Sequence, residues 1–178
     1  MNETFLNKCI EHVELEGYQV LGRRDREGQW GGGVLAFVLD EYAPRVTLIE
    51  ISAVAERIWA MLHSDRGPYL VCCWYRPPSP GNIDSINSFE LELRKHRDDA
   101  VGVFVLGDLN VHSIRWLTHS ARESIEGRQL RDTSDRLGLK QIVKEPTRGE
   151  YLLDLVLTDL EGVSDRGLPS VDLALVAV

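Results

Sequence analysis

The sequence predicts an α/β sandwich built around mixed β-sheet. Predicted strands outnumber predicted helices, long hairpin strands come early, and single helices are inserted later in the chain. This order differs from a regular alternation of strands and helices, which would favour a parallel sheet. The chain has 178 residues, a length that can bury a single core, so we expect one domain over residues 1–178.

The first half of the chain contains three predicted strands. Residues 33–39 are almost continuously apolar and follow two glycines, which indicates a buried strand after a flexible segment. Residues 54–62 and 69–75 are separated by a Gly-Pro break, which predicts a hairpin. The prolines of residues 77–80 end the second strand, because proline cannot donate a ladder hydrogen bond.

Two helices are predicted among the later strands. Residues 82–99 carry apolar side chains at helical spacing behind Asn82, a residue type that favours the start of a helix. Residues 124–137 form the second predicted helix, and Gly138 is a suitable end for it. Further strands are expected at residues 101–106, 139–143, 151–157 and 171–178.

The composition is that of an ordinary soluble protein. Hydrophobic residues make up 43% of the chain and charged residues 27%, and the longest apolar runs are too short to span a bilayer, so no membrane partner is expected. Met1 is followed by polar residues rather than by a secretory signal, which predicts an intracellular location, nuclear or cytoplasmic. The chain has three cysteines, Cys9, Cys72 and Cys73. An odd number cannot pair completely, and neighbours on a strand point to opposite faces, so we expect reduced thiols.

The formal net charge of −8 argues against a general nucleic-acid coat protein, because phosphate binding usually depends on Lys and Arg. A nucleic acid would therefore need a local basic patch. One candidate patch contains Arg23, Arg24 and Arg26, and the other is the basic run at residues 94–97. Either could equally be solvated surface charge.

The most informative segment is an apolar strand, residues 103–106, that leads directly into Gly-Asp-Leu-Asn at residues 107–110. Side chains two positions apart on a strand share one face, so Asp108 and Asn110 are expected to point the same way. Asp108 could take a proton from water while the Asn110 amide holds a phosphate oxygen. The same tetrapeptide could also be a turn whose side chains bond the local backbone.

Other short segments, taken in chain order, add a second pattern. They are Glu3, Thr4 and Phe5; Asp25 and Arg26; Gly31, Gly32, Gly33 and Val34; Glu56, Ile58 and Trp59; Tyr75, Arg76, Pro77 and Pro78; the loop at 107–110 with His112 and Trp116; Leu130, Gly138 and Leu139; Pro146, Thr147 and Arg148; and Asp154, Leu155 and Val156. In this order they resemble the endonuclease/exonuclease/phosphatase superfamily, especially the endonuclease domain of non-LTR (LINE-type) retrotransposons. The resemblance covers nearly the whole chain.

The resemblance implies a four-layered α/β sandwich of two mixed β-sheets flanked by helices. It also implies a phosphodiesterase that uses Mg²⁺ or Mn²⁺ to nick DNA. Glu3 and Asp172 are the metal ligands that it implies, and one or two carboxylates suffice because Mg²⁺ keeps several waters. Glu3 taken without the resemblance would be an ordinary surface carboxylate.

The same resemblance implies the catalytic roles. Asp108 would activate the attacking water, Asn110 would position water and phosphate, and Tyr75 would donate a hydrogen bond to developing negative charge. Asp154 corresponds to the residue that orients a catalytic histidine in the family. Tyr75 taken alone could be a core residue at a strand end. Substrate-binding roles are expected for Arg26, His112 and Trp116.

Two departures from the family pattern put this activity in doubt. The family's closing Ser-Asp-His matches Ser170 to Leu173 here, so Leu173 stands where the histidine belongs. Losing one such donor typically costs about 100 to 1000-fold in rate, and Asp154 would lack its partner. The family's usual first strand is also missing, so we expect a domain truncated at the N-terminus, with reduced stability or self-association through an exposed sheet edge.

Three hypotheses of function follow from these observations. The first is a metal-dependent endonuclease that nicks DNA, from a retrotransposon reading frame or a host gene derived from one. The second is a non-catalytic remnant of such a domain that serves as a binding module, which the histidine replacement and the acidic balance favour. The third keeps the fold but changes the substrate to a phospholipid or small phosphate ester, and the Tyr-Arg-Pro-Pro and glycine-run segments argue against it.

Overall fold

The computed structural model describes residues 4, 6, 10, 12–26, 31–147, 149–162 and 175–177, the last of these for the backbone only. Two sheets and their connecting helices make up this part of the chain. The elements in chain order are β1 (Tyr18–Arg24), β2 (Val34–Leu39), the short 3-10 helix η1 (Ala43–Arg45), β3 (Val46–Ile51), β4 (Glu56–Ser64), β5 (Gly67–Tyr75), α1 (Asp84–His96), β6 (Gly102–Asp108), α2 (Ile125–Leu137), β7 (Lys140–Gln141), β8 (Asp154–Thr158) and β9 (Leu175–Ala177).

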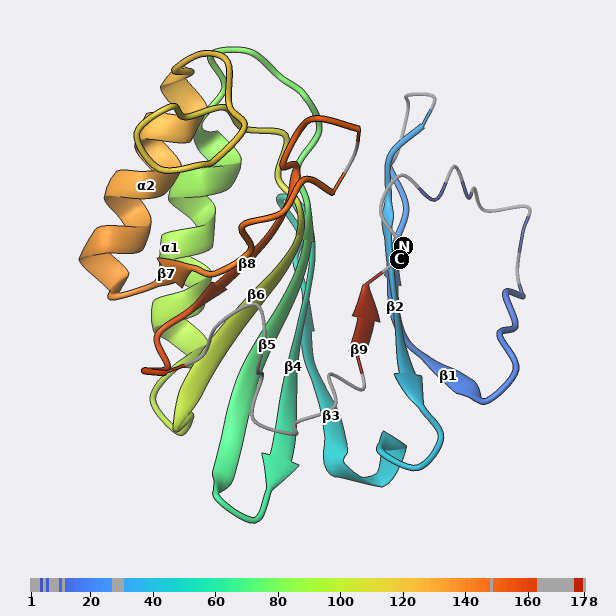
Figure 1. Cartoon of the computed structure of the whole chain (residues 1–178). Helices are drawn as coiled ribbons and strands as arrows, with labels where there is room; N and C mark the ends of the chain where they lie inside the picture. The colour runs from blue at the N-terminus through green and yellow to red at the C-terminus, as the bar shows by residue number, and fades with distance from the viewer. Residues whose placement is uncertain are drawn as a thin grey trace.

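The layers of the fold follow the expected sandwich. A six-stranded sheet of order β3-β4-β5-β6-β8-β7 carries α1 and α2 on one face, and a three-stranded sheet of order β1-β2-β9 lies beside the other face (Figure 1). The large sheet is mixed because β5 and β6 run parallel, whereas the small sheet is antiparallel. The predicted two-sheet α/β sandwich is therefore confirmed, and the described ranges supply three of its four expected layers.

The predicted hairpin is confirmed as β4 and β5, which pair from Glu56 opposite Tyr75 to Ser64 opposite Gly67. Both strands are buried along most of their length, because one face packs under the helices and the other faces the small sheet. Because side chains alternate between the two faces of a strand, each strand has one set of apolar side chains under the helices and another toward the small sheet. Neighbouring cysteines follow this division, since Cys72 packs on the helix side and Cys73 on the side of the small sheet.

Both cysteines are free and buried, as the sequence predicts, and burial raises the pKa of the Cys73 thiol to about 12. A buried thiol with a raised pKa is held as an inert core group rather than as a nucleophile. Cys9 lies outside the described residues.

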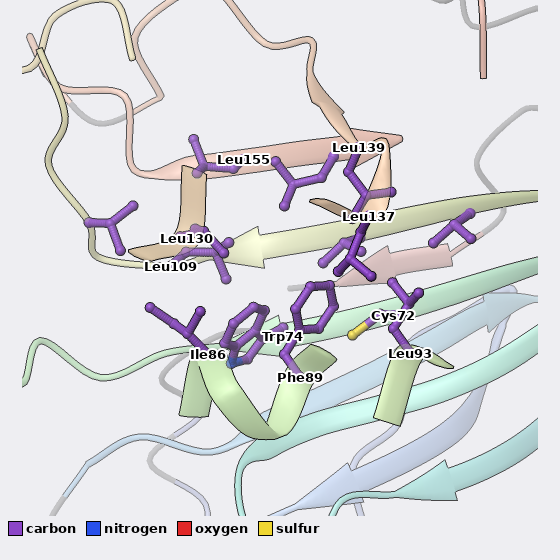
Figure 2. Close-up of a cluster of buried hydrophobic side chains, with 14 of the residues drawn as sticks. Cys72, Trp74, Ile86, Phe89, Leu93, Leu109, Leu130, Leu137, Leu139 and Leu155 are labelled. Carbon is purple, nitrogen blue, oxygen red and sulfur yellow. The ribbon is translucent and has the colours of Figure 1, made fainter. Parts of the chain in front are cut away.

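The helices cover the large sheet through a core that Figure 2 shows. Phe89 of α1 stacks on Trp74 of β5 with 4.9 Å between ring centroids. It also stacks on Trp59 of β4, with 5.9 Å between the centroids. Leu130 and Leu137 bring α2 into the same cluster. Neither helix of the described ranges is long and apolar enough to cross a membrane.

The predicted helix boundaries are close to the observed ones. Ser124 caps α2 by accepting a hydrogen bond from Gly127 N at 2.9 Å, and Gly138 ends the helix in a left-handed conformation with φ of 72°. The helix predicted at 82–99 is shorter, because α1 begins after the N-cap Ile83. Asn82 lies one position before this N-cap, and its side chain accepts a hydrogen bond from the backbone N of Asp84 at 2.9 Å.

Strands β1 and β3 were not predicted from the sequence, and their surroundings explain why. Each is an outer strand of its sheet, so its side chains do not form a continuous buried run. Val20 and Leu48 are about half exposed, and charged or small residues interrupt both strands. The expected self-association through an exposed sheet edge stays a prediction.

A buried ion pair joins α1 to the large sheet. Arg57 of β4, whose side chain is fully buried, donates to Glu92 of α1 at 3.0 Å, and Trp59 Nε1 donates to the same carboxylate at 2.7 Å. Burial works to raise the pKa of Glu92, but the hydrogen bonds and charge of Arg57, helped by Trp59 and Ser52, outweigh it and hold the pKa below its ordinary value. The carboxylate is thus kept ionised beneath the helix.

Replacing Glu92 by alanine should destabilise the fold strongly, because it leaves the Arg57 guanidinium buried without its counter-charge. The expected loss is about 3–5 kcal/mol in the free energy of unfolding, measured by urea denaturation. Glu90→Ala is the matched control on the same helix. Glu90 binds Arg94 and Arg136 at the surface, where such pairs contribute about 0–1 kcal/mol. Equal losses in the two variants would contradict the prediction.

The acid dependence of stability supplies a second readout for the same pair. A carboxyl group whose pKa is lower in the folded state stabilises the fold above its unfolded pKa, and this contribution disappears as the pH falls through the lowered value. The difference in stability between wild type and Glu92→Gln should therefore be largest near neutral pH and shrink in acid.

Candidate active site

Four strand ends meet at one end of the large sheet. Glu56 begins β4 opposite Tyr75 at the end of β5, and Asp108 at the end of β6 lies opposite Asp154 at the start of β8. The parallel pairing of β5 with β6 brings these two pairs side by side, and Arg76 N donates to Asp108 O at 2.9 Å. Far-separated parts of the sequence thus reach the same edge of the sheet.

These four side chains also belong to one face of the sheet. Ile58, Cys73, Leu106 and Val156 each lie two positions from one of them, and each packs toward the small sheet. Since side chains two positions apart share a face, the four strand-end residues lie on the face turned toward the small sheet, at an end of the interface between the two sheets that we call the mouth. The structure therefore gathers the predicted residues Tyr75, Asp108 and Asp154, and it adds Glu56.

Asp108 is buried, with 2% of its surface exposed, and its carboxylate accepts a hydrogen bond from Asn110 N at 3.1 Å. Strand β6 ends at Asp108, so the expected strand alternation does not reach Asn110. Asn110 has a φ of 46°, in the left-handed region, and its side-chain Nδ2 donates to Arg76 O at 2.9 Å. The prediction that Asp108 and Asn110 share one strand face is wrong, because the chain turns between them.

Leu109 anchors this turn from the opposite side. It is 1% exposed and packs in the helix-side core with Leu130 and Leu155 (Figure 2). Val111 and Leu117 enter the same cluster and hold the loop that follows. Asp108 thus faces the mouth between the sheets while its neighbour is fixed in the core.

Gly107 allows the two central strands to approach at this end. Its φ is 148°, and a Cβ atom built at this position would lie 1.9 Å from the backbone oxygen of Trp74. Only glycine fits such a contact without moving one of the strands. Asp108 can therefore hold its position only because the preceding residue is a glycine.

Arg26 lies at the opposite wall of the mouth and is engaged by protein groups. Its Nε donates to Glu56 at 2.6 Å, and its guanidinium lies 5.7 Å from the centre of the Tyr75 ring. Glu56 also accepts from Gly33 N at 2.6 Å. Burial works to lower the pKa of Arg26, but the hydrogen bond and charge of Glu56 outweigh it and the pKa is raised. Sequence reasoning gave Glu56 no role, although it belongs to a motif.

His112 and Trp116 are both predicted to bind substrate, but His112 lines a pocket whereas Trp116 packs against the core. His112 lines a pocket of about 330 Å³ together with Asn110 and Arg122. Burial lowers the pKa of His112, the charge of Arg122 lowers it further, and Glu126 opposes both. Ser124, the cap of α2, fixes this segment by donating its hydroxyl to His112 O at 3.0 Å. Trp116 is partly buried and packs against the helix-side core.

The two basic segments are largely paired within the protein. Arg23 binds Asp25 at 2.7 Å, Arg94 binds Glu90 at 2.9 Å and Arg97 binds Asp159 at 2.6 Å. Neither the basic-patch prediction nor the alternative of solvated surface charge anticipated these ion pairs. A polyanion would meet carboxylates together with these cations.

The expected metal ligands Glu3 and Asp172 lie outside the described residues, as does Leu173. Within the described ranges no group of three or more His, Cys, Asp or Glu side chains could hold a metal ion. The two carboxylates that do converge, Asp108 and Asp154, carry oxygen atoms, which are the donors that Mg²⁺ prefers. The donor chemistry fits the ion, and the ligands implied by the resemblance would have to complete the site.

Arg76, like Glu56, is a residue of the site to which sequence reasoning gave no role. Its side chain is buried and reaches backbone carbonyl groups of two loops, residues 77–82 and 109–110. The only signal in the sequence is its place within Tyr-Arg-Pro-Pro. A positive charge that follows an apolar strand gives no indication by itself that it will be enclosed.

Comparison with known proteins finds a family model and solved structures that are similar to this chain. A family model described as endonuclease-reverse transcriptase matches residues 69–167, more than half of the chain. The endonuclease domain of TRAS1, a telomere-specific non-LTR retrotransposon, has the same fold with a TM-score of 0.60 and 18% identity. That match covers 80% of this chain and 65% of the TRAS1 structure, so this chain spans just under two thirds of its length.

Two further solved structures match with lower scores. The catalytic domain of human Nocturnin with bound sulfate has a TM-score of 0.47 and 14% identity, over 80% of this chain and 60% of that one. A mutant of Cimex nitrophorin, in its ferrous NO complex, has a TM-score of 0.43 and 16% identity, over 80% and 63%. No curated protein matches the sequence.

Gly107→Ala should disrupt this end of the sheet, because its Cβ would collide with the Trp74 backbone. Backbone strain of this kind costs about 1–3 kcal/mol before the steric clash is added, so the loss should exceed that range in chemical denaturation. Gly138→Ala is the control. Gly138 also has a positive φ, of 72°, but a Cβ there meets nothing within 4 Å, so its loss should be about 1 kcal/mol. A Gly107 variant no less stable than the control would contradict the assigned contact.

Proposed function

This chain belongs to the endonuclease-reverse transcriptase family, and from that membership we propose that it is a metal-dependent phosphodiesterase that nicks DNA. The observation that carries the proposal is the convergence of Tyr75, Asp108 and Asp154 at one mouth between the two sheets, with Asn110 on the adjoining turn. These side chains come from separate strands and supply the hydrogen-bonding groups that hydrolysis of a phosphodiester requires.

Asp108 is proposed as the general base. The carboxylate lies at the strand end, where the tight Gly107 contact fixes its backbone and the Asn110 N–H orients one of its oxygens. A carboxylate can accept several hydrogen bonds, so this contact is compatible with a bound water. Asp108 would take a proton from that water as it attacks phosphorus.

Asn110 and Tyr75 are proposed to act on the phosphate. The side-chain oxygen of Asn110 and one of its two N–H groups would orient the attacking water and the phosphate, while the other N–H stays on Arg76 O. The hydroxyl of Tyr75 would donate to charge that develops on a phosphate oxygen. Arg26 beside the Tyr75 ring would hold that residue in place and add positive charge at the wall of the mouth.

Glu3 and Asp172 are the proposed ligands of Mg²⁺ or Mn²⁺. The ion supplies positive charge beside the phosphate and lowers the pKa of bound water. Asp154, directly opposite Asp108, is proposed to contribute to the same acidic surface. His112 and Trp116 are proposed to contact the DNA on the side of the α2 cap.

A second candidate function is a non-catalytic DNA-binding or protein-binding remnant. Leu173, which replaces the family's histidine in the sequence, favours it, because leucine offers no hydrogen bond to a phosphate. The two functions share the fold and differ only in whether the remaining groups suffice for cleavage.

Nicking of supercoiled plasmid in Mg²⁺ tests the first function. The Asp108→Asn variant should lose about 100-fold or more of the rate, because a general base contributes about that much. Asp65→Asn is the matched control and should retain the wild-type rate, because the Asp65 side chain is 97% exposed and lies in the turn between β4 and β5, at the other end of the hairpin from Glu56 and Tyr75. A soluble phosphate ester assayed in parallel tests the alternative substrate class. Wild-type protein that shows no metal-dependent nicking at high concentration would reject the endonuclease.

Leu173→His separates a single missing donor from a lost site. If the rest of the site is intact, the nicking rate should rise, with about 100-fold as the scale of one restored donor. Leu173→Phe is the control, because it introduces a ring without an N–H donor and should leave the rate unchanged. The gain should vanish when Asp108→Asn is added. A Leu173→His protein no faster than wild type would favour the binding remnant.

A further inference from the structure

The Arg76 side chain is enclosed by backbone carbonyl groups. Only 2% of the residue is exposed. Nη2 donates to Asn82 O at 2.7 Å and to Ser79 O at 3.2 Å. Nη1 lies 3.4 Å from three more carbonyl oxygens, those of Pro77, Leu109 and Asn110. The Nη2 bonds are the stronger ones by distance. The guanidinium therefore ties the proline loop, residues 77–82, to the loop at 109–110.

A buried guanidinium surrounded by neutral acceptors is costly to desolvate. Burial lowers the pKa of Arg76, and the charge of Glu126 opposes that effect. Glu126 lies in the first turn of α2 and accepts a hydrogen bond from Gly81 N. The proline loop is thus held from one side by Arg76 and from the other by the start of α2.

Arg76 also bonds the turn that carries Asn110. Its backbone N donates to Asp108 O at 2.9 Å, and its backbone O accepts from the Asn110 side chain at 2.9 Å. Asn110 has a φ of 46°, a conformation that costs a non-glycine residue about 1 kcal/mol or more and persists where its surroundings enforce it. Arg76 supplies that enforcement from both its backbone and its side chain.

The proline loop separates two pockets beside the strand ends. One, of about 330 Å³, contains Asn110 and His112, and the other, of about 300 Å³, contains Glu56 and Tyr75. Arg76 and Ser79 line both pockets. A shift of this loop would therefore change both pockets at once.

We propose that Arg76 is a positioning residue, whose guanidinium fixes Asn110 and the wall between the two pockets in the geometry that cleavage needs. The proposal rests on the proposed phosphodiesterase function. Lysine cannot take over this role, because a single ammonium group cannot bond carbonyls on both sides as a planar guanidinium does. Arg76 acts through Asn110 and the loop rather than through the DNA.

Arg76→Lys and Arg57→Lys form the matched pair for the test. Both arginines are buried, but Arg57 bonds Glu92, Ser85 O and Ser88 beneath α1. Plasmid nicking by Arg76→Lys should show a kcat lower by about tenfold or more, the effect of a misplaced catalytic group. Its KM for DNA should change by less than about threefold. Arg57→Lys should lower the unfolding midpoint at least as much while its kcat stays within about threefold of wild type. Equal loss of kcat in the two variants would overturn the proposal.

Combination with Asn110→Ala tests whether Arg76 acts through Asn110. If it does, Arg76→Lys should have little further effect on kcat in the Asn110→Ala background, because coupled residues are not additive. If the double variant instead shows the product of the two single losses of kcat, the two residues act independently, and this result would overturn the proposal that Arg76 acts through Asn110.

The NMR signals of the Asn110 side-chain amide provide a readout that needs no activity. These signals should move and lose protection from hydrogen exchange in Arg76→Lys and stay in place in Arg57→Lys. Absence of nicking by wild-type protein would reject the proposed function, and the amide signals would then still decide whether Arg76 holds Asn110. Unchanged Asn110 signals in Arg76→Lys would overturn the positioning role in either case.

Discussion

The register of β4, β5, β6 and β8 is the constraint on which the rest of the structure depends. It sets Glu56 against Tyr75 and Asp108 against Asp154, and the alternation of strands turns all four into the same mouth. A slip of one residue in β6 would turn Asp108 under the helices and Leu109 into the mouth. Gly107 against the Trp74 backbone and Leu109 in the core oppose such a slip from two directions. The stability of the fold and the geometry of the site are therefore set by the same contacts.

The sequence predicted those parts of the fold in which burial is continuous. The hairpin of β4 and β5, the strand before Asp108 and both helices have apolar patterns long enough to identify them. Strands β1 and β3 were not predicted because outer strands mix exposed and buried positions. The pairing that makes them strands also comes from other segments of the chain. The site could be predicted only as separate motifs, since sheet register is not written in any local pattern.

Both interpretations of the Gly-Asp-Leu-Asn segment have a counterpart in the structure. The segment ends strand β6 at Asp108 and then turns, and the side chains of Asp108 and Asn110 bond the backbone there, as the simpler interpretation holds. It also delivers the Asp108 side chain to the strand-end cluster, as the proposed chemistry requires. Sequence reasoning left Arg76 aside because an arginine after a strand suggests surface charge, and its burial arises only when the proline loop and the Asn110 turn close over it.

The energetic cost of this end of the sheet bears on the choice between an enzyme and a remnant. An Asn110 with positive φ and an Arg76 guanidinium bonded to neutral carbonyl groups each work against stability. The helix side of the same sheet shows the opposite arrangement, since Arg57 there meets a carboxylate and stacked aromatic rings. A domain retained only as a scaffold gains nothing from such features, because an apolar strand end would be more stable. The proposed phosphodiesterase accounts for both features, because it needs Asn110 and the proline loop in one fixed geometry.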